Sequence, residues 1–284
     1  MSMPSANLLR SAQAYWDASA ETYEQDFAGT LIGQLRRQAV WSELDRVFRL
    51  DQRVLELNCG PGIDALHLAE RGIRVVACDI SPRMIELGRE RLAAARLGNL
   101  VEFRVLATEN IASLSDVYAF DGVFSNFSGL NCVDDLSLVA RNLARLLKPG
   151  APAVFCMMGR FVPWEMAWFL AHCDVRRAFL RWRVSGSGLD AQKVSVRCPS
   201  LSEVTRLLAP EFRRKSWKSV GITVPPSYME RWARSFERTT KALARSDRLL
   251  GRVPILRNVG DCLVMEFERR REGKTDHASQ EPAS

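Results

Sequence analysis

The sequence is poor in the residues on which metal sites and disulfide frameworks depend. Three histidines occur in 284 residues, far apart at His67, His172 and His277, so no zinc site is predicted. The seven cysteines form no C-x-x-C pair and are odd in number, which favours reduced thiols. No run approaches the roughly 18 apolar residues of a membrane span, and Met1–Arg10 lacks the pattern of a signal peptide. These absences predict a cytoplasmic protein.

The composition is that of a globular protein, with 47% hydrophobic and 26% charged residues, and the length allows one large domain or two small ones. The formal charge of +7 is unevenly distributed. Between Gly159 and Lys218 there are twelve basic and five acidic residues, which accounts for the whole excess. This segment forms either a solvated basic surface or one that attracts an anionic substrate or a membrane surface.

The N-terminal fifty residues contain one clear helix. Residues 1–14 are expected to be a loose start, and the apolar periodicity from Gly33 to Leu50 predicts an amphipathic helix. Arg37 falls in the middle of its apolar face and Arg36 at the edge of that face. Because burying an unpaired charge is costly, Arg37 is expected to have a partner.

Short apolar segments then alternate with helical ones, which predicts βαβ units and a parallel sheet with helices on both faces. Ser81 and Pro82 predict the start of a helix that reaches Ala95. The expected strands are Arg53–Asn58, Ile73–Cys78, Val101–Leu106, Phe120–Ser125, Ala153–Met157, Trp217–Val224 and an antiparallel Asp261–Glu268; the other expected helices are Ile63–Arg71, Leu136–Leu147, pieces of Pro163–Trp182, Ser200–Ala209 and Met229–Leu250.

The pattern divides the chain into five parts. Residues 1–50 are expected to form a helical lid, 51–158 the nucleoside-binding core and 159–199 a substrate-binding insertion. Residues 200–271 complete the core sheet, and the polar residues 272–284 are expected to be a disordered tail.

The segment from Val54 to Asp64 is an apolar strand that ends in a tight glycine turn before a helix. Glycines allow positive φ and close approach of a ligand, and the new helix presents unpaired N–H groups. Asp79 ends the next strand, where a carboxylate can accept hydrogen bonds from ribose hydroxyls. Gly60 and Gly62 also fit a dinucleotide fingerprint, but Glu56 at the strand end would repel a pyrophosphate and not a cationic sulfonium cofactor.

Here the chain resembles the Rossmann-like, or class I, S-adenosylmethionine-dependent methyltransferases over about Tyr15 to Met158. The resemblance implies an α/β fold with a doubly wound seven-stranded sheet, mostly parallel with an antiparallel C-terminal strand. It implies S-adenosylmethionine as cofactor and a small molecule as methyl acceptor. The implied cofactor-binding residues are the strand-end acid and its turn, the ribose acid, the adenine neighbours and the residues after the third and fourth strands: Glu56, Asn58, Gly60, Gly62, Asp79, Ile80, Met84, Thr108, Glu109, Asn126 and Phe127.

Two further regions are linked to function by this resemblance. Tyr15–Glu24 is similar to a lid motif of the family, so Tyr23 is expected to close over the cofactor and Arg37 to pair with its carboxylate. His172 is a weak candidate for a general base in the variable region after the fifth strand. The aromatic segment Phe161–Leu170, followed by Arg176, Arg177, Arg181 and Arg183, forms either core packing or the wall of a pocket for an apolar or anionic metabolite.

Four alternative functions stay open at this point. A nicotinamide-dependent oxidoreductase is disfavoured by Glu56 and by the antiparallel last strand. A nucleic-acid methyltransferase fits the basic excess, but Ser125–Ser128 lacks the N-P-P-Y loop that holds a flipped base, and no nucleic-acid partner is expected. A metal-dependent catechol-type enzyme would need a cluster of acids, and a non-catalytic protein would bind the cofactor without turnover.

Overall fold

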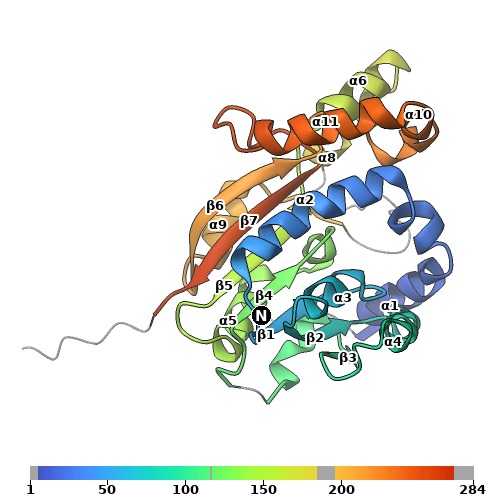
Figure 1. The fold of residues 1–284 in the computed structure, drawn as a ribbon. Helices are drawn as coiled ribbons and strands as arrows, with labels where there is room; N and C mark the ends of the chain where they lie inside the picture. Colours follow the sequence, from blue (N-terminus) through green and yellow to red (C-terminus); the bar gives the residue numbers. More distant parts are fainter. Residues whose placement is uncertain (1–5, 116, 184–195, 272–284) are drawn as a thin grey trace, which may run out of the picture.

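The computed structural model describes residues 6–115, 117–183 and 196–271, and within them a seven-stranded sheet has helices on both faces (Figure 1). The order of strands is β3-β2-β1-β4-β5-β7-β6, and β7 alone runs antiparallel to its neighbours. The strands are β1 Arg53–Leu57, β2 Arg74–Asp79, β3 Val101–Val105, β4 Gly122–Ser125, β5 Pro152–Met158, β6 Phe212–Val220 and β7 Cys262–Arg269. The predicted fold class, including the antiparallel last strand, is therefore confirmed.

Helices cover both faces of the sheet, and α6, α10 and α11 gather at one end of the molecule (Figure 1). The helices are α1 Ala6–Ala20, α2 Leu31–Val47, α3 Ile63–Ala69, α4 Pro82–Ala95, α5 Leu136–Leu146, α6 Pro163–Ala171, α7 Val175–Ala178, α8 Leu180–Arg183, α9 Leu201–Leu208, α10 Glu230–Ser235 and α11 Glu237–Leu250, with short turns η1 Glu24–Ala28, η2 Thr108–Ser113, η3 Gly129–Cys132 and η4 Ser227–Met229. No helix in the described part of the chain is long and apolar enough to span a membrane.

Strand β1 contributes to two cores because its side chains alternate between the faces of the sheet. Leu55 and Leu57 of β1 belong to the core beneath α5 and α9, whereas Val54 belongs to the core beneath α2, α3 and α4. Glu56 lies on the same face as Val54, so its carboxylate is directed toward the α2–α3 layer. The alternation thus places Glu56 inside the protein, where it is the fully buried charged residue of β1.

Helix starts follow the sequence signals closely. The Ser81 hydroxyl accepts a hydrogen bond from the Met84 amide at 3.1 Å, with Pro82 in the first turn, as predicted. Ser200 and Glu203 form a reciprocal capping box at the start of α9. These local bonds satisfy amides that no intrahelical carbonyl can reach.

Three predicted elements need correction. Residues 6–14, expected to be loose, are helical, because α1 packs on α4 and Asp17 accepts hydrogen bonds from the Ser81 hydroxyl and the Arg83 amide. The strand expected at Trp217–Val224 begins at Phe212 and ends at Val220, with an irregular register between Arg214 and Ser216.

The third error concerns the expected helix Met229–Leu250, which is broken at Phe236 (φ −120°, ψ 48°) into α10 and α11. The Thr240 hydroxyl donates hydrogen bonds to the carbonyls of Ala233 and Phe236. A side-chain hydroxyl of this kind competes with backbone amides for helix carbonyls, which accompanies the break between α10 and α11. The expected tail 272–284 lies outside the described residues.

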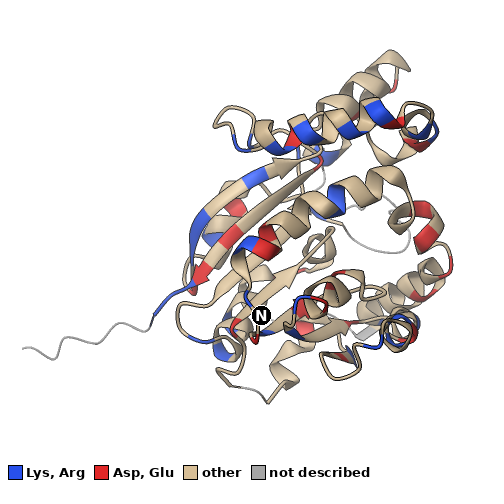
Figure 2. Cartoon of the chain, in the orientation of Figure 1, with Lys and Arg blue, Asp and Glu red and all other residues tan. Residues whose placement is uncertain are grey.

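Charge is distributed unevenly over this frame. Figure 2 shows Lys and Arg along β6 and α11, whereas α6 is mostly uncharged. Several of the β6 charges are paired, since Arg213 and Lys215 both contact Glu268 at 3.1 Å. Part of the basic segment found in the sequence is therefore paired surface charge.

Candidate active site

A pocket of about 230 Å³ lies at the carboxyl ends of β1, β2 and β4. The order of strands reverses between β1 and β4, and this switch point is where open α/β sheets bind ligands. The structure brings nine of the predicted cofactor residues to the wall of this pocket: Tyr23, Arg37, Asn58, Gly60, Asp79, Ile80, Met84, Asn126 and Phe127. We call it the first pocket.

The turn after β1 has the backbone that its composition predicts. Asn58, Gly60 and Gly62 have φ of 55°, 52° and 70°, all in the left-handed region. The side-chain oxygen Oδ1 of Asn58 accepts hydrogen bonds from the hydroxyls of Thr108 at 3.1 Å and Ser125 at 3.3 Å. Asn58 therefore does more than tolerate the turn, because its side chain ties β1 to β4 and to the segment after β3.

Asp79 holds the turn from the neighbouring strand. Its carboxylate accepts from the Gly60 amide at 2.8 Å and from the Ser81 amide at 2.9 Å, and it is 8% exposed at the pocket wall. Burial raises the pKa of Asp79 above its ordinary value, although these two amides act in the opposite direction. Each carboxylate oxygen keeps a second lone pair for a ligand.

Arg37 has the partner that its position on the apolar face requires. Its guanidinium contacts the Asp64 carboxylate at 2.7 Å and lies 4.7 Å from the centre of the Phe127 ring. Asp64 also accepts from the Trp41 indole at 2.6 Å and from the Asn126 amide at 2.9 Å. Burial would lower the pKa of Arg37, but the Asp64 charge raises it above its usual range. Arg37 therefore stays a cation at the wall of the first pocket.

Glu56 lies beneath the first pocket and does not line it. It is 1% exposed, and its Oε2 has no hydrogen-bond partner among the described residues. Burial, followed by the charge of Asp64, raises the pKa of Glu56 well above its ordinary value, and Arg37 only partly compensates. An unpartnered buried carboxyl is costly, which marks this group as one that a cationic ligand would stabilise.

Four other predicted residues stand away from the pocket walls. Gly62 supports the turn from behind, where an added Cβ would lie 2.4 Å from the Phe103 ring. Thr108 bonds to Asn58, and Glu109 is half-buried in η2 with its pKa raised by burial. His172 is exposed at the end of α6 and hydrogen-bonded to the Trp168 carbonyl at 2.8 Å, and it does not line the first pocket.

Several residues of the first pocket were not proposed from the sequence. Asp64 is the most consequential of them. Two sequence features point to it: a carboxylate in the first turn of the helix after the glycine turn, and a buried-face arginine, Arg37, that requires a partner. The others include Tyr15 and Trp16 of α1, Cys132 of η3, Met158 at the end of β5, and Val196. These come from segments distant in sequence, which only the fold assembles.

A second pocket of about 350 Å³ adjoins the first. Trp16, Tyr23, Phe127, Ser128 and Met158 line both, so these five side chains form a shared wall. The rest of the second pocket is partly apolar, with Phe27, Pro226 and Tyr228. Two cavities meeting at the carboxyl edge of one sheet give room for two reacting molecules.

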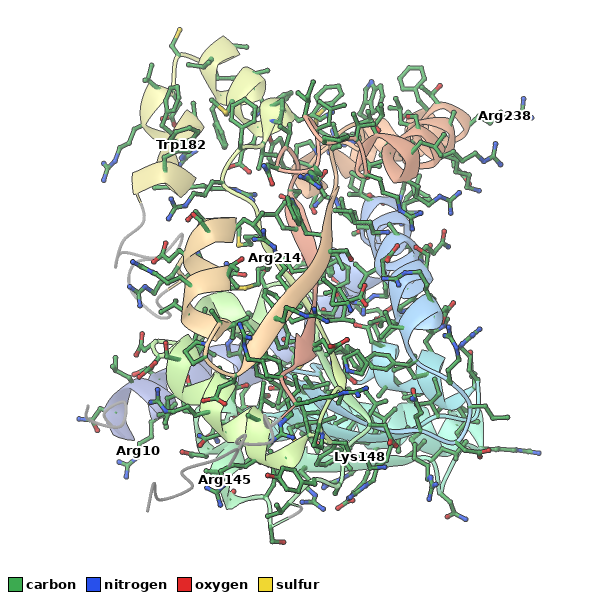
Figure 3. All side chains as sticks on the ribbon, turned by 90° about the vertical axis from the view of Figure 1, so that its left-hand side faces the viewer. Arg10, Arg145, Lys148, Trp182, Arg214 and Arg238 are labelled. Atoms are coloured by element: carbon green, nitrogen blue, oxygen red, sulfur yellow. The ribbon has the colours of Figure 1, made fainter. Side chains whose placement is uncertain are left out.

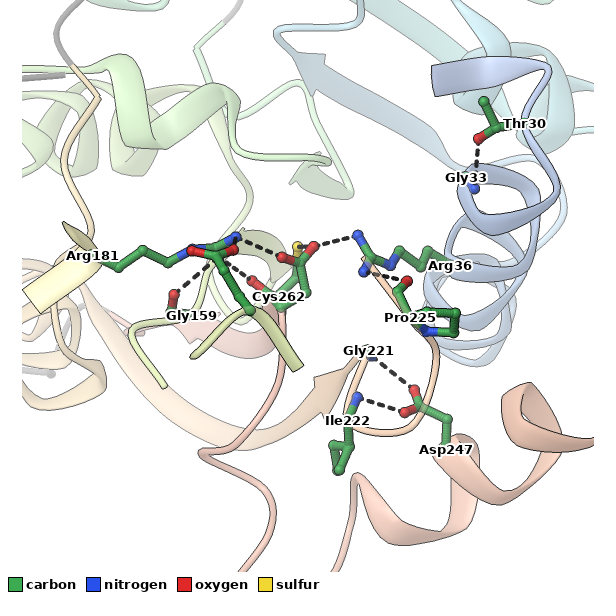
Figure 4. A network of polar contacts seen from close by, with 12 residues as sticks. Thr30, Gly33, Arg36, Gly159, Arg181, Gly221, Ile222, Pro225, Asp247 and Cys262 are labelled. Carbon is green, nitrogen blue, oxygen red and sulfur yellow. Dashed lines mark hydrogen bonds and ion pairs between the residues drawn. The ribbon is translucent and has the colours of Figure 1, made fainter. Parts of the chain in front are cut away.

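One side of the second pocket is a network of ion pairs (Figure 4). Asp261 bridges Arg36 at 2.6 Å and Arg181 at 2.8 Å, and Arg181 also contacts Glu165 at 2.6 Å. Burial would raise the pKa of Asp261, but the charges of Arg36 and Arg181 more than offset it and hold the pKa below its usual value. Two cations and two anions leave this side of the pocket neutral overall.

This network revises the role expected for the arginines after the aromatic segment. Arg181 is buried and engaged by two carboxylates, so its charge is already balanced. Arg176 and Arg177 are exposed, and the side chain of Arg183 lies outside the described residues. Of the two interpretations of Phe161–Leu170, core packing does not apply to α6, which contains no buried residue, although Val162 just before it is buried.

The sequence matches a known family over the part of the chain that contributes most residues of the first pocket. Residues 54–150 match the family model described as "Methyltransferase domain". The tRNA 5-carboxymethoxyuridine methyltransferase of Escherichia coli K12 is 32% identical over 143 residues, which cover 48% of this chain and 52% of that protein. A ubiquinone biosynthesis O-methyltransferase of Xanthomonas axonopodis is 32% identical over 108 residues, 38% of this chain and 44% of that protein. The chain thus spans about half the length of these relatives.

The fold has relatives among solved structures. Geranyl diphosphate C-methyltransferase of Streptomyces coelicolor, crystallised with S-adenosylhomocysteine, aligns with a TM-score of 0.59 at 16% identity, covering 94% of this chain and 99% of that chain. At this identity the likeness concerns the fold alone.

Proposed function

Residues 54–150 form a class I methyltransferase domain, and from this premise we propose that the protein transfers the methyl group of S-adenosylmethionine to a small molecule. The observation that carries the proposal is the pair of pockets with a shared wall at the switch point of the sheet. In this interpretation the first pocket holds the cofactor and the second pocket holds the acceptor.

The residues of the first pocket fit the cofactor chemically. Asp79 would accept the ribose hydroxyls, Ile80 and Met84 would flank the adenine, and the turn at Asn58–Gly62 lets the backbone approach the ligand. The buried carboxyl of Glu56, whose Oε2 has no partner among the described residues, favours a cationic ligand over a pyrophosphate. Arg37, held by Asp64, would attract the cofactor carboxylate, and Tyr23 beside it would cover the site.

When bound, the cofactor supplies an already activated methyl group on a sulfonium. The task of the protein is then to align the acceptor and to exclude water, a form of positioning that can lower a barrier by several kcal/mol. The aromatic shared wall, Trp16, Tyr23 and Phe127, suits that task. The Tyr228 hydroxyl in the second pocket stays protonated at neutral pH and does not supply a base, since partial burial, followed by the Glu165 charge, raises its pKa to about 12.

The second pocket indicates the acceptor class. Its apolar part favours an aromatic or aliphatic body, and its neutral ion-pair network offers polar groups without a net charge. We therefore favour an apolar or amphiphilic metabolite over a strongly charged one. The Xanthomonas relative, by its name, acts in ubiquinone biosynthesis, which fits an acceptor of this kind.

Calorimetric titration with S-adenosylhomocysteine tests the cofactor assignment. We expect saturable binding, weakened about tenfold by Asp79→Asn, which is about 1.4 kcal/mol. Asp45→Asn is the control, because Asp45 pairs with His67 outside the pocket and its removal should leave the dissociation constant unchanged. A wild-type protein that gives no binding heat with S-adenosylhomocysteine, but does with NADH, would overturn the assignment.

One observation favours a second candidate, a nucleic-acid acceptor, because the Escherichia coli relative is named for a tRNA modification. Salt-dependent binding to bulk tRNA, with incorporation of labelled methyl groups into it, would establish this alternative. Incorporation into a lipid extract and not into tRNA would exclude it.

A further inference from the structure

An apolar surface surrounds the outer side of the second pocket. Helix α6 is rich in large apolar residues yet buries none of them. Trp168 and Leu170 are 40% and 45% exposed, and Tyr228 of η4 is 49% exposed. Trp168 and Phe169 contact the Tyr228 ring at centroid distances of 5.6 and 6.0 Å. We call these four residues, Trp168, Phe169, Leu170 and Tyr228, the aromatic face.

Such a surface is unusual for a side of a protein that faces only water. Single exposed apolar residues are common, but a contiguous group with three or more aromatic rings marks a contact surface. The rings pack against one another across α6 and η4, so they form one surface. Figure 3 shows this end of the molecule, with Trp182 and Arg238 at its two sides.

The charges around the aromatic face identify its partner. The acids nearby are engaged: Glu165 pairs with Arg181, and Glu230 accepts from the amides of Leu31 and Ile32 and contacts Arg234. Among the described residues, exposed Arg176, Arg231 and Arg238 have no ion-pair partner.

A surface with aromatic rings at its centre and unpaired arginines around it is complementary to an anionic bilayer. Tryptophan and tyrosine prefer the headgroup level, and each arginine near an anionic membrane adds attraction. We propose that the aromatic face docks on anionic membrane surfaces.

The aromatic face is continuous with the second pocket. Tyr228 belongs to both, and Glu165 of α6 lines the pocket from the same helix that carries Trp168. An amphiphile that leaves the bilayer at this point would enter the second pocket without crossing bulk water. This part of the inference rests on the proposed function, whereas docking itself does not.

Co-sedimentation of the full chain with vesicles tests the docking. We expect binding to phosphatidylcholine vesicles that contain about 30 mol% phosphatidylglycerol, and little binding to phosphatidylcholine alone. Trp168→Ser with Leu170→Ser should lower the partition coefficient roughly tenfold or more. Leu50→Ser is the matched control, because Leu50 is 67% exposed in the connection between α2 and β1 and should have no effect.

A charge-reversal variant separates electrostatics from apolar contact. Arg176→Glu with Arg231→Glu should abolish the preference for phosphatidylglycerol, and binding should weaken as salt rises. S-adenosylhomocysteine affinity, measured on the same variants, should stay at the wild-type value, so that loss of docking is distinguishable from loss of the proposed function.

Three results would overturn the docking proposal. The first is absence of vesicle binding by the wild type, and the second is binding that neither the α6 variant nor the charge reversal reduces. The third is a wild-type dimer that does not bind vesicles and that the α6 substitutions convert to a monomer, because the aromatic face would then be the contact between two copies of the chain.

Discussion

Replacement of Asp64 by asparagine is the sharpest test of how the first pocket is built. The change keeps the shape of the side chain and removes its charge. Asp64 accepts from three donors, the Arg37 guanidinium, the Trp41 indole and the Asn126 amide, at 2.6–2.9 Å. Asparagine has one acceptor oxygen and presents an NH₂ group toward donors, so at least one of the three loses its partner.

The size of the expected loss of stability follows from the burial of the Arg37–Asp64 ion pair. The side chains of Arg37 and Asp64 are 7% and 5% exposed, and breaking a buried ion pair from one side costs about 3–5 kcal/mol because the other charge is left uncompensated. The same removal at the Lys148–Asp121 pair, whose lysine is 52% exposed, should cost less than about 1 kcal/mol. Lys148→Met is therefore the control.

Urea unfolding of four proteins completes the test. We compare the wild type, Asp64→Asn, Arg37→Met and the double variant, and expect the double variant to be less destabilised than the sum of the singles by about 2 kcal/mol or more. If Asp64→Asn lowers the free energy of unfolding by less than about 1 kcal/mol, the pair does not hold this pocket together and the reasoning is refuted.

Three further predictions concern the turn, the buried carboxyl and a helix cap. Gly62→Ala should lower the free energy of unfolding by roughly 3 kcal/mol, because the added Cβ would meet the Phe103 ring. Gly60→Ala should lower it by about 1 kcal/mol, because the space around Gly60 is open. Equal losses of the two variants in urea unfolding would contradict this steric argument. The pKa of Glu56 in the folded protein is raised above its ordinary 4.5, so the unfolded chain loses this proton first and the free energy of unfolding falls as pH rises above 4.5. Glu56→Gln should make this fall with pH shallower. Parallel pH profiles of the variant and the wild type would count against the prediction. Ser200→Ala should cost about 1 kcal/mol through loss of the capping box, and a thermal midpoint equal to that of the wild type would argue otherwise.

The sequence predicts best what is determined locally. The turn at Asn58–Gly62, the Ser81 cap and the alternation of strands with helices depend on near neighbours, and the structure contains all of them. The apolar pattern also placed Arg37 on a buried face and implied a partner. The fold class followed from these local signals.

What the sequence missed depends on contacts between distant segments. Helix α1 is held by α4, the β6 boundary is obscured by charged residues on an exposed strand, and α10 and α11 separate where a threonine competes for backbone carbonyls. Asp64 was overlooked because its role exists only once α2, α3 and the end of β4 meet. The second pocket, built from α1, β5, α8 and the start of β7, has no signature in any single segment.

The position of β7 has a consequence for biosynthesis. It lies between β5 and β6, yet it is made after both, and β6 has no other strand partner in the described chain. While a ribosome is still translating residues 262–269, the nascent chain carries an unpaired strand, a hazard for aggregation. Asp261 and Cys262, at the entry to β7, complete the second pocket, so this pocket can close only after β7 has been made.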